Sequence, residues 1–214
     1  RNIISDFGLS AFYYYRDHSG RYSQYFEDEP WYYPYDNTGY RREFSPYAKT
    51  RLLLGPLSLY GDIQWRYTDF RYNGLEDFPG ESWNFLNWSS GISYNFRNSQ
   101  IYWGIGRTNR EPTRTDLFSG WDDFIPDYYN EVLPETALSN EIGYKFATRD
   151  FSISTNIYYM DFSNEIVLNG QVGPNSIMLH QNAAESFRSG IELDLRQNID
   201  NWEFRISGNA SYNR

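Results

Sequence analysis

Two clusters of aromatic residues stand beside carboxylates, a combination that could bind a bulky ligand. The rings are Trp31, Tyr32, Tyr33 and Tyr35 in the first cluster and Trp121, Phe124, Tyr128 and Tyr129 in the second. Aromatic side chains bring a large contact area and a polar edge at a low entropic cost. Such rings could stack on a metal chelate, a porphyrin or a sugar. The alternative is that the rings pack their own loops together.

Three arginines, Arg107, Arg110 and Arg114, lie near the end of the strand expected at about 100–108 and could contact an anionic ligand. Surface arginines more often pair with local carboxylates, and Glu111 and Asp116 are the nearest partners in the sequence. Both readings stay open, and the three arginines join the eight aromatic residues as candidate ligand-binding residues.

The sequence offers few residues that could hold a metal ion. It contains no cysteine and only two histidines, His18 and His180, both in segments expected to be loops. Asp122, Asp123 and Asp127 supply the oxygen atoms that calcium prefers, but their spacing is not that of an EF-hand. We therefore predict no metal site and no cofactor.

A catalytic function is poorly supported. Glu192 and Asp194 lie two residues apart on one strand face, but Arg188 and Arg196 flank them and would hold both carboxylates ionised. The nucleophile elbow and the phosphate-binding glycine loop are both missing. A net charge of −9 also argues against nucleic acid as a partner. We predict that the protein is not an enzyme.

The segments that must position these residues alternate strictly between apolar and polar side chains. In residues 187–196, Phe187, Ile191 and Leu195 share one register, and charged residues occupy the other. Side chains switch face at every residue of a strand, so this pattern predicts a sheet with one apolar and one polar face. The expected strands cover about residues 3–15, 45–54, 57–72, 83–96, 100–108, 137–148, 151–162, 185–197 and 202–212.

The connections between these strands are long and short in turn. Loops are expected at 18–44, 73–81, 109–136 and 163–184, with short turns between them, so one rim of an up-and-down sheet carries the long loops. Outer-membrane barrels have this asymmetry, and Tyr and Trp near the strand ends suggest aromatic girdles. We predict an all-β, antiparallel up-and-down meander of about nine long strands, with its charged register lining an aqueous interior. A soluble β-sandwich, with the apolar registers packed together, is the alternative.

Four sequence strings strengthen the barrel interpretation. Residues 110–118 read Arg-Glu-Pro-Thr-Arg-Thr-Asp-Leu-Phe and follow Trp-Gly-Ile-Gly at 103–106. Leu-Pro-Glu at 133–135 then leads to Glu-Ile-Gly at 141–143, and a Tyr-rich strand from Tyr158 to Ile166 precedes Asn182 and Gly-Ile-Glu at 190–192. In this order the strings resemble the β-barrel of TonB-dependent outer-membrane receptors. The resemblance is good over 94–214, whereas residues 1–84 match only in strand style.

The resemblance implies an energised importer of a scarce, bulky nutrient in the outer membrane of a Gram-negative bacterium. An iron-siderophore complex is favoured over haem, cobalamin, glycan or peptide, and haem is further disfavoured because no histidine lies between Pro112 and Leu133. Residues 1–214 would form part of a 22-stranded transmembrane barrel, without its plug domain. The implied partners are outer-membrane lipid, the plug and the rest of the barrel, the TonB energy-coupling protein and a small-molecule nutrient.

Two other functions remain to be distinguished from import. A soluble, aromatic-rich β-sandwich could act as a carbohydrate-binding module or adhesin, with sugar held by the long loops. A passive pore of the porin type would share the girdled barrel, but the ordered strings argue against it. The first residues open directly into an expected strand, and the last residues lie within an alternating segment. We therefore expect the sequence to be a piece of a longer chain.

Overall fold

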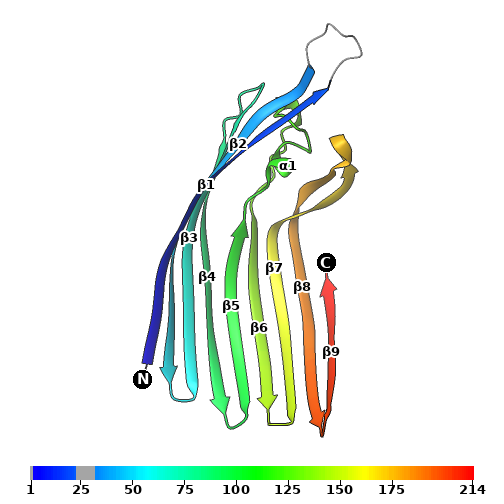
Figure 1. Ribbon diagram of the computed structural model, residues 1–214. Coiled ribbons are helices and arrows are strands. Elements are labelled where there is room, and N and C mark those ends of the chain that lie inside the picture. The colour runs from blue at the N-terminus through cyan, green and yellow to red at the C-terminus, as the bar shows by residue number, and fades with distance from the viewer. Residues whose placement is uncertain (1, 23–31) are drawn as a thin grey trace.

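The computed structural model describes residues 2–22 and 32–214, and these form one antiparallel sheet of nine strands in chain order (Figure 1). The predicted all-β meander is confirmed. A short helix, α1 (Arg114–Leu117), and two 3₁₀ turns, Pro126–Tyr128 and Pro174–Ser176, lie in the connections. No helix in the described ranges is long and apolar enough to cross a membrane. The strands are β1 (Asn2–Tyr22), β2 (Tyr32–Leu54), β3 (Leu57–Asn73), β4 (Glu81–Phe96), β5 (Ser99–Arg110), β6 (Glu135–Ala147), β7 (Phe151–Val172), β8 (Met178–Ile199) and β9 (Trp202–Asn213).

The apolar register forms a belt across the whole sheet. Side chains directly opposite on neighbouring strands share a face, so the pairing places one row of apolar residues on all nine strands. This row is Ile3, Leu52, Leu59, Ile92, Trp103, Ile142, Ile157, Ile191 and Ala210. We call the face that carries it the outer face and the opposite, charged face the inner face.

The outer face is uncovered among the described residues. Phe7 is 77% exposed, and Ile157 and Ile191 are about half exposed. Because the described part of the chain forms a single sheet, no second layer packs on this register. The β-sandwich alternative is therefore wrong. The inner face pairs its charges across strands, as in Lys49 with Asp62 at 3.2 Å and Arg205 with Asp194 at 2.9 Å.

One rim of the sheet carries the tight turns, as predicted (lower edge of Figure 1). The connections there are 55–56, 97–98, 148–150 and 200–201. Gly55, Arg97 and Asp200 take positive φ angles of 62°, 50° and 51°, which lets the chain reverse within two residues. The longer connections 74–80 and 111–134 lie at the opposite rim, which we call the loop rim.

Towards the loop rim, several strands extend further than the sequence pattern predicted. Residues 32–44 belong to β2 rather than to a loop, although Pro34 and Asn37 to Gly39 were expected to end any regular element. The pairing explains this: β2 pairs with β3 only from Thr38 onward, so residues 32–37 have β1 as their one neighbour. Proline is tolerated where one edge of a strand needs no donor. Similarly, β7 and β8 continue through most of 163–184, and only 173–177 separate them.

Tyrosine rings on the inner face lie over glycines on the next strand. In each case the two residues are direct partners in the sheet. A side chain added to the glycine would overlap the ring, so the ring fills space that only a glycine leaves free. Aromatic covering of glycine helps to fix strand register. Four pairs lie in the wall below the loop rim: Tyr47 with Gly8, Tyr60 with Gly91, Tyr102 with Gly143, and Tyr158 with Gly190. Tyr35 with Gly20 forms a fifth pair at the loop rim.

Candidate functional site

The loop rim holds a compact aromatic core, which we call the loop core. Phe118 is 1% exposed and lies at its centre. The Phe118 ring centroid is 5.0 Å from that of Tyr72, 5.3 Å from that of Phe78 and 5.4 Å from that of Phe124. Leu117 is buried in the same cluster. The 111–134 connection is therefore anchored through its own side chains to β3 and to the 74–80 connection.

A capping box sets the start of this connection. The Thr113 side chain accepts a hydrogen bond from the backbone N–H of Asp116 (3.3 Å), and Asp116 Oδ2 accepts one from the backbone N–H of Thr113 (2.7 Å). Such reciprocal bonds satisfy donors that the first turn of a helix leaves free. Asp116 Oδ1 also lies 2.9 Å from Nδ1 of His180 on β8. The helical turn therefore packs against β8 on the far side of the loop rim.

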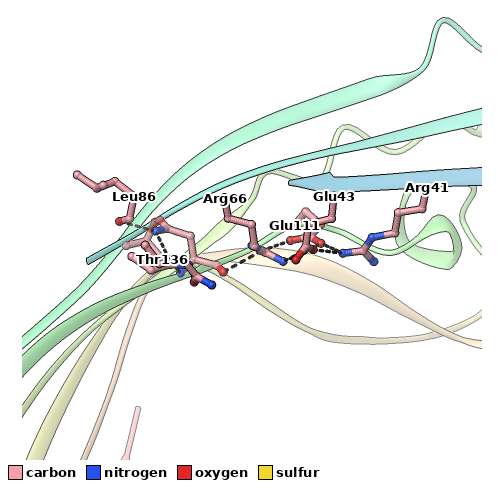
Figure 2. A network of polar contacts seen from close by, with 9 residues as sticks. Arg41, Glu43, Arg66, Leu86, Glu111 and Thr136 are labelled. Atoms are coloured by element: carbon pink, nitrogen blue, oxygen red, sulfur yellow. Dashed lines mark hydrogen bonds and ion pairs between the residues drawn. The ribbon is translucent and has the colours of Figure 1, made fainter. Parts of the chain in front are cut away.

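A buried carboxylate joins the same connection to the inner face (Figure 2). Glu111 is 7% exposed and accepts charge-assisted hydrogen bonds from Arg41 on β2 and Arg66 on β3. Arg66 also lies 3.4 Å from Glu43 and donates to the carbonyl of Asn109 at 3.3 Å. Two arginines thus face two glutamates, and their formal charges cancel.

The tip of the connection is tied to the ends of β2 and β3. The Tyr72 hydroxyl donates to Asp123 and accepts from the backbone N–H of Phe124 at 3.2 Å. The Asn37 amide donates to Asp123 Oδ1 at 2.9 Å and to the carbonyl of Asp122 at 2.8 Å. These bonds hold residues 121–124 in one place, so the side chains next to them are preorganised.

A hollow of about 650 Å³ opens beside this tip, and three predicted residues line it: Tyr35, Trp121 and Phe124. We call it the tip hollow. Its other walls include Leu75 and Asp127. Its size lies in the range of ligand pockets. Aromatic rings beside carboxylates could stack on a flat or chelated ligand and accept hydrogen bonds from it.

The remaining aromatic candidates have different environments. Tyr128 is 53% exposed, and its ring centroid lies 5.2 Å from that of Trp121. Tyr129 packs on Phe78 and Phe124 and donates a hydrogen bond to Glu81 at 2.6 Å. Burial and this bond raise the pKa of Tyr129 above its ordinary value. Phe124 and Tyr129 therefore contribute to the loop core, and Phe124 also lines the tip hollow.

The first aromatic cluster is only partly described. Trp31 lies outside the described residues. Tyr32 and Tyr33 begin β2, but the structure does not describe their side chains. Tyr35 is half-buried, and its ring stacks on His18 with centroids 4.5 Å apart. Of this cluster, Tyr35 is thus the residue that joins residues of the second cluster around the tip hollow.

The three predicted arginines lie apart from one another. Arg107 is in the outer register, opposite Trp88 and Leu138. Arg110 pairs with Glu135 at 2.9 Å. Arg114 lies at the start of α1, where it donates to the carbonyl of Asp122 and stands 5.6 Å from the Phe118 ring centroid.

The carboxylates named as partners of these arginines have other roles. Glu111 binds Arg41 and Arg66, and Asp116 binds Thr113 and lies against His180, so that expectation is wrong. Arg41, Glu43 and Arg66 were not identified from the sequence. Their positions in the charged register of β2 and β3 were the available signal. In residues 2–22 and 32–214, no three His, Asp or Glu side chains converge as a metal site would require.

The chain matches the family model described as "TonB dependent receptor-like, beta-barrel" over residues 3–214. No curated protein sequence matches it. Among solved structures, the copper transporter OprC superposes with a TM-score of 0.83 at 12% identity, covering 100% of this chain and 35% of OprC. The ferric yersiniabactin uptake receptor FyuA from Yersinia pestis gives 0.70 at 15% identity, covering 100% and 33%.

A third structure is similar over most of the chain. The siderophore receptor PiuA from Acinetobacter baumannii gives a TM-score of 0.60 at 22% identity, with 86% of this chain and 27% of PiuA covered. The chain therefore spans about a third of the length of the proteins that it resembles. At these identities the likeness establishes the fold.

Proposed function

Because the chain belongs to the TonB dependent receptor-like β-barrel family, whose members are receptors and transporters of the Gram-negative outer membrane, we propose that it is part of an active importer in that membrane. Residues 1–214 contribute nine strands to a barrel of 22. The rest of the full-length protein supplies the other strands, the plug and the contact with the TonB energy-coupling protein. The transported nutrient is scarce and bulky, and it enters from the loop rim.

The observation that carries this proposal is the uncovered apolar belt across all nine strands, opposite an inner face of paired charges. An outward apolar band suits lipid, and a charged inner wall suits water or a plug. The sorting of tight turns to one rim and the folded 111–134 connection to the other supports a periplasmic and an extracellular end. The tip hollow then lies on the side from which a nutrient arrives.

We propose an iron-siderophore complex as the cargo. FyuA and PiuA are named for siderophore uptake, whereas OprC is named a copper transporter, so the fold leaves the cargo open. Thioether, thiolate and imidazole groups are the usual protein ligands of copper, and this sequence has no Cys, two Met and two His. The tip hollow offers aromatic walls instead, which favour a large complex with its metal already chelated.

Deletion of the full-length gene should abolish uptake of one ferric siderophore while leaving the uptake of others unchanged. Uptake of ⁵⁵Fe supplied on a panel of siderophores measures this directly. Uptake should also stop when the proton-motive force is dissipated, because the import is energised. If iron uptake is unchanged but copper or glycan uptake is lost, the cargo is copper or glycan and not a siderophore complex.

Trp121→Ala should weaken binding of the transported complex about 10-fold without unfolding the loop rim. Trp121 lines the tip hollow and is only partly buried. Its removal should therefore weaken stacking on the ligand more than it weakens the packing of the loop. Equilibrium binding of ⁵⁵Fe-labelled complex to the purified full-length receptor measures the loss. Trp202→Ala is the matched control, because Trp202 is 72% exposed beside a tight turn at the opposite rim. Equal affinity of both variants would mean that Trp121 does not contribute to the binding site.

A further inference from the structure

A second hollow of about 290 Å³ lies between the inner face of β1–β4 and residues 111–115. We call it the inner hollow. Tyr14, Phe70 and Trp83 contribute aromatic walls, and Arg16, Arg41 and Arg114 contribute three cationic side chains. The size suffices for one arm of a chelate rather than for a whole complex.

We propose that the inner hollow binds a carboxylate group of the transported ligand, with Arg16 and Arg114 as the cationic donors. This inference rests on the proposed import function and adds the chemical class of the cargo: an anionic metal complex that carries a free carboxylate. A neutral complex would leave Arg16 without a charged counterpart.

The charge balance around the hollow favours an anion. Arg41 and Arg66 are neutralised by Glu43 and Glu111, and Asp69, which also lines the hollow, is paired with Arg42. Arg16 has no carboxylate partner in the described part of the chain, so these residues leave its charge uncompensated.

Arg114 faces Asp122, Asp123, His18 and Arg16. Its guanidinium donates to the backbone carbonyl of Asp122. Burial lowers the pKa of Arg114, and the nearby Arg16 adds to that effect. A bound anion would offset both influences and so stabilise the charged form of Arg114.

Three residues that line the hollow also carry a buried polar atom without a hydrogen-bond partner among the described residues: Nε of Arg41, Nε of Arg114 and Oγ1 of Thr68. A buried donor without an acceptor costs about 1–3 kcal/mol. The two Nε atoms can only donate, and a hydroxyl can do so as well. A carboxylate matches this set because it accepts through two oxygens and fits the planar fork of a guanidinium.

Equilibrium binding to the purified full-length receptor tests the proposal with two probes, ferric citrate and a neutral ferric trihydroxamate. Wild type should bind ferric citrate more tightly. Arg16→Gln should weaken ferric citrate binding roughly 10-fold to 100-fold, the loss expected for a hydrogen bond to a charged group. It should leave the trihydroxamate unchanged. Arg16 is exposed, so its replacement should not disturb folding.

Arg196→Gln is the control. Arg196 is also an exposed inner-face arginine, but it is paired with Glu203 beside a tight turn. Arg114→Lys provides a second variant that keeps the charge and removes Nε, and we expect it to weaken ferric citrate binding as well. A preference for the neutral chelate, or equal effects of Arg16→Gln and Arg196→Gln, would overturn the carboxylate site.

Two further outcomes separate this inference from the import function. If Arg16→Gln lowers the melting temperature but not the affinity, a carboxylate of the protein itself occupies the hollow and the inference is wrong. If neither ferric chelate binds, the siderophore proposal fails. Calorimetry with citrate alone then tests whether the inner hollow binds a carboxylate. Citrate binding that Arg16→Gln weakens at least about 10-fold supports the site, and no citrate binding overturns it.

Discussion

Glu111→Gln should detach the 111–134 connection from the inner face of the sheet. The substitution removes the carboxylate that Arg41 and Arg66 share and leaves these two arginines facing Glu43 alone. Removing one partner of a buried ion pair costs about 3–5 kcal/mol. Because Arg41 is 40% exposed, water will compensate part of this loss, and we expect a loss of stability near the lower end of that range.

Hydrogen–deuterium exchange of the full-length receptor measures this effect locally. A loss of about 3 kcal/mol corresponds to exchange more than 100-fold faster at the amides of Phe118 and Asn130, which bond within the connection. Glu131→Gln is the matched control, since Glu131 is exposed in the same connection. Exchange that stays at the wild-type rate would mean that the loop core alone holds the connection.

Phe118→Ala should disorder the loop rim and abolish binding of the transported complex. Phe118 contacts Phe70, Tyr72, Phe78 and Phe124 through ring pairs with centroids 5.0–6.0 Å apart. Replacing a buried phenylalanine by alanine costs about 3–5 kcal/mol, because a cavity remains where the ring was. The walls of the tip hollow depend on this core through Phe124, so we expect affinity to fall with local stability.

Near-ultraviolet circular dichroism and ⁵⁵Fe-complex binding report the two losses separately. Phe204→Ala is the control, because Phe204 is 52% exposed on the outer face of β9. The barrel strands should keep their far-ultraviolet signal in both variants, since the loop core lies at one rim. If Phe118→Ala binds the complex normally, the loop rim is not the binding surface.

The sheet could be predicted because its signal repeats at every second residue. Ile157 and Ile191 show this well: each lies in an alternating segment, and each occupies the outer belt. The tight turns were equally clear, since they separate two alternating runs by a few residues. The strand ends were less clear, because Pro34 and Asn37 have local preferences for turns that pairing with β1 overrides.

The candidate site was predicted in part. Tyr35, Trp121 and Phe124 meet around the tip hollow although Tyr35 is 86 residues from Trp121. The pairing of β2 with β1 and the folding of the 111–134 connection against Asn37 and Tyr72 create this proximity together. Glu111 was assigned to the nearest arginines because sequence distance was the only guide. Its true partners, Arg41 and Arg66, are 70 and 45 residues away. Ion-pair partners across a sheet follow register and loop folding, which a single sequence does not reveal.

The tyrosine–glycine pairs of the inner face have a consequence for the width of the channel. Each ring lies above a residue without a side chain, as Tyr102 does over Gly143. The ring therefore lies along the wall instead of projecting from it. In the importer proposed above, these four places would add aromatic packing without narrowing the interior of the barrel much, which would leave room for a plug to shift or a bulky solute to pass. Either residue of a pair can be exchanged during evolution only at the expense of its partner, so the two positions should change together.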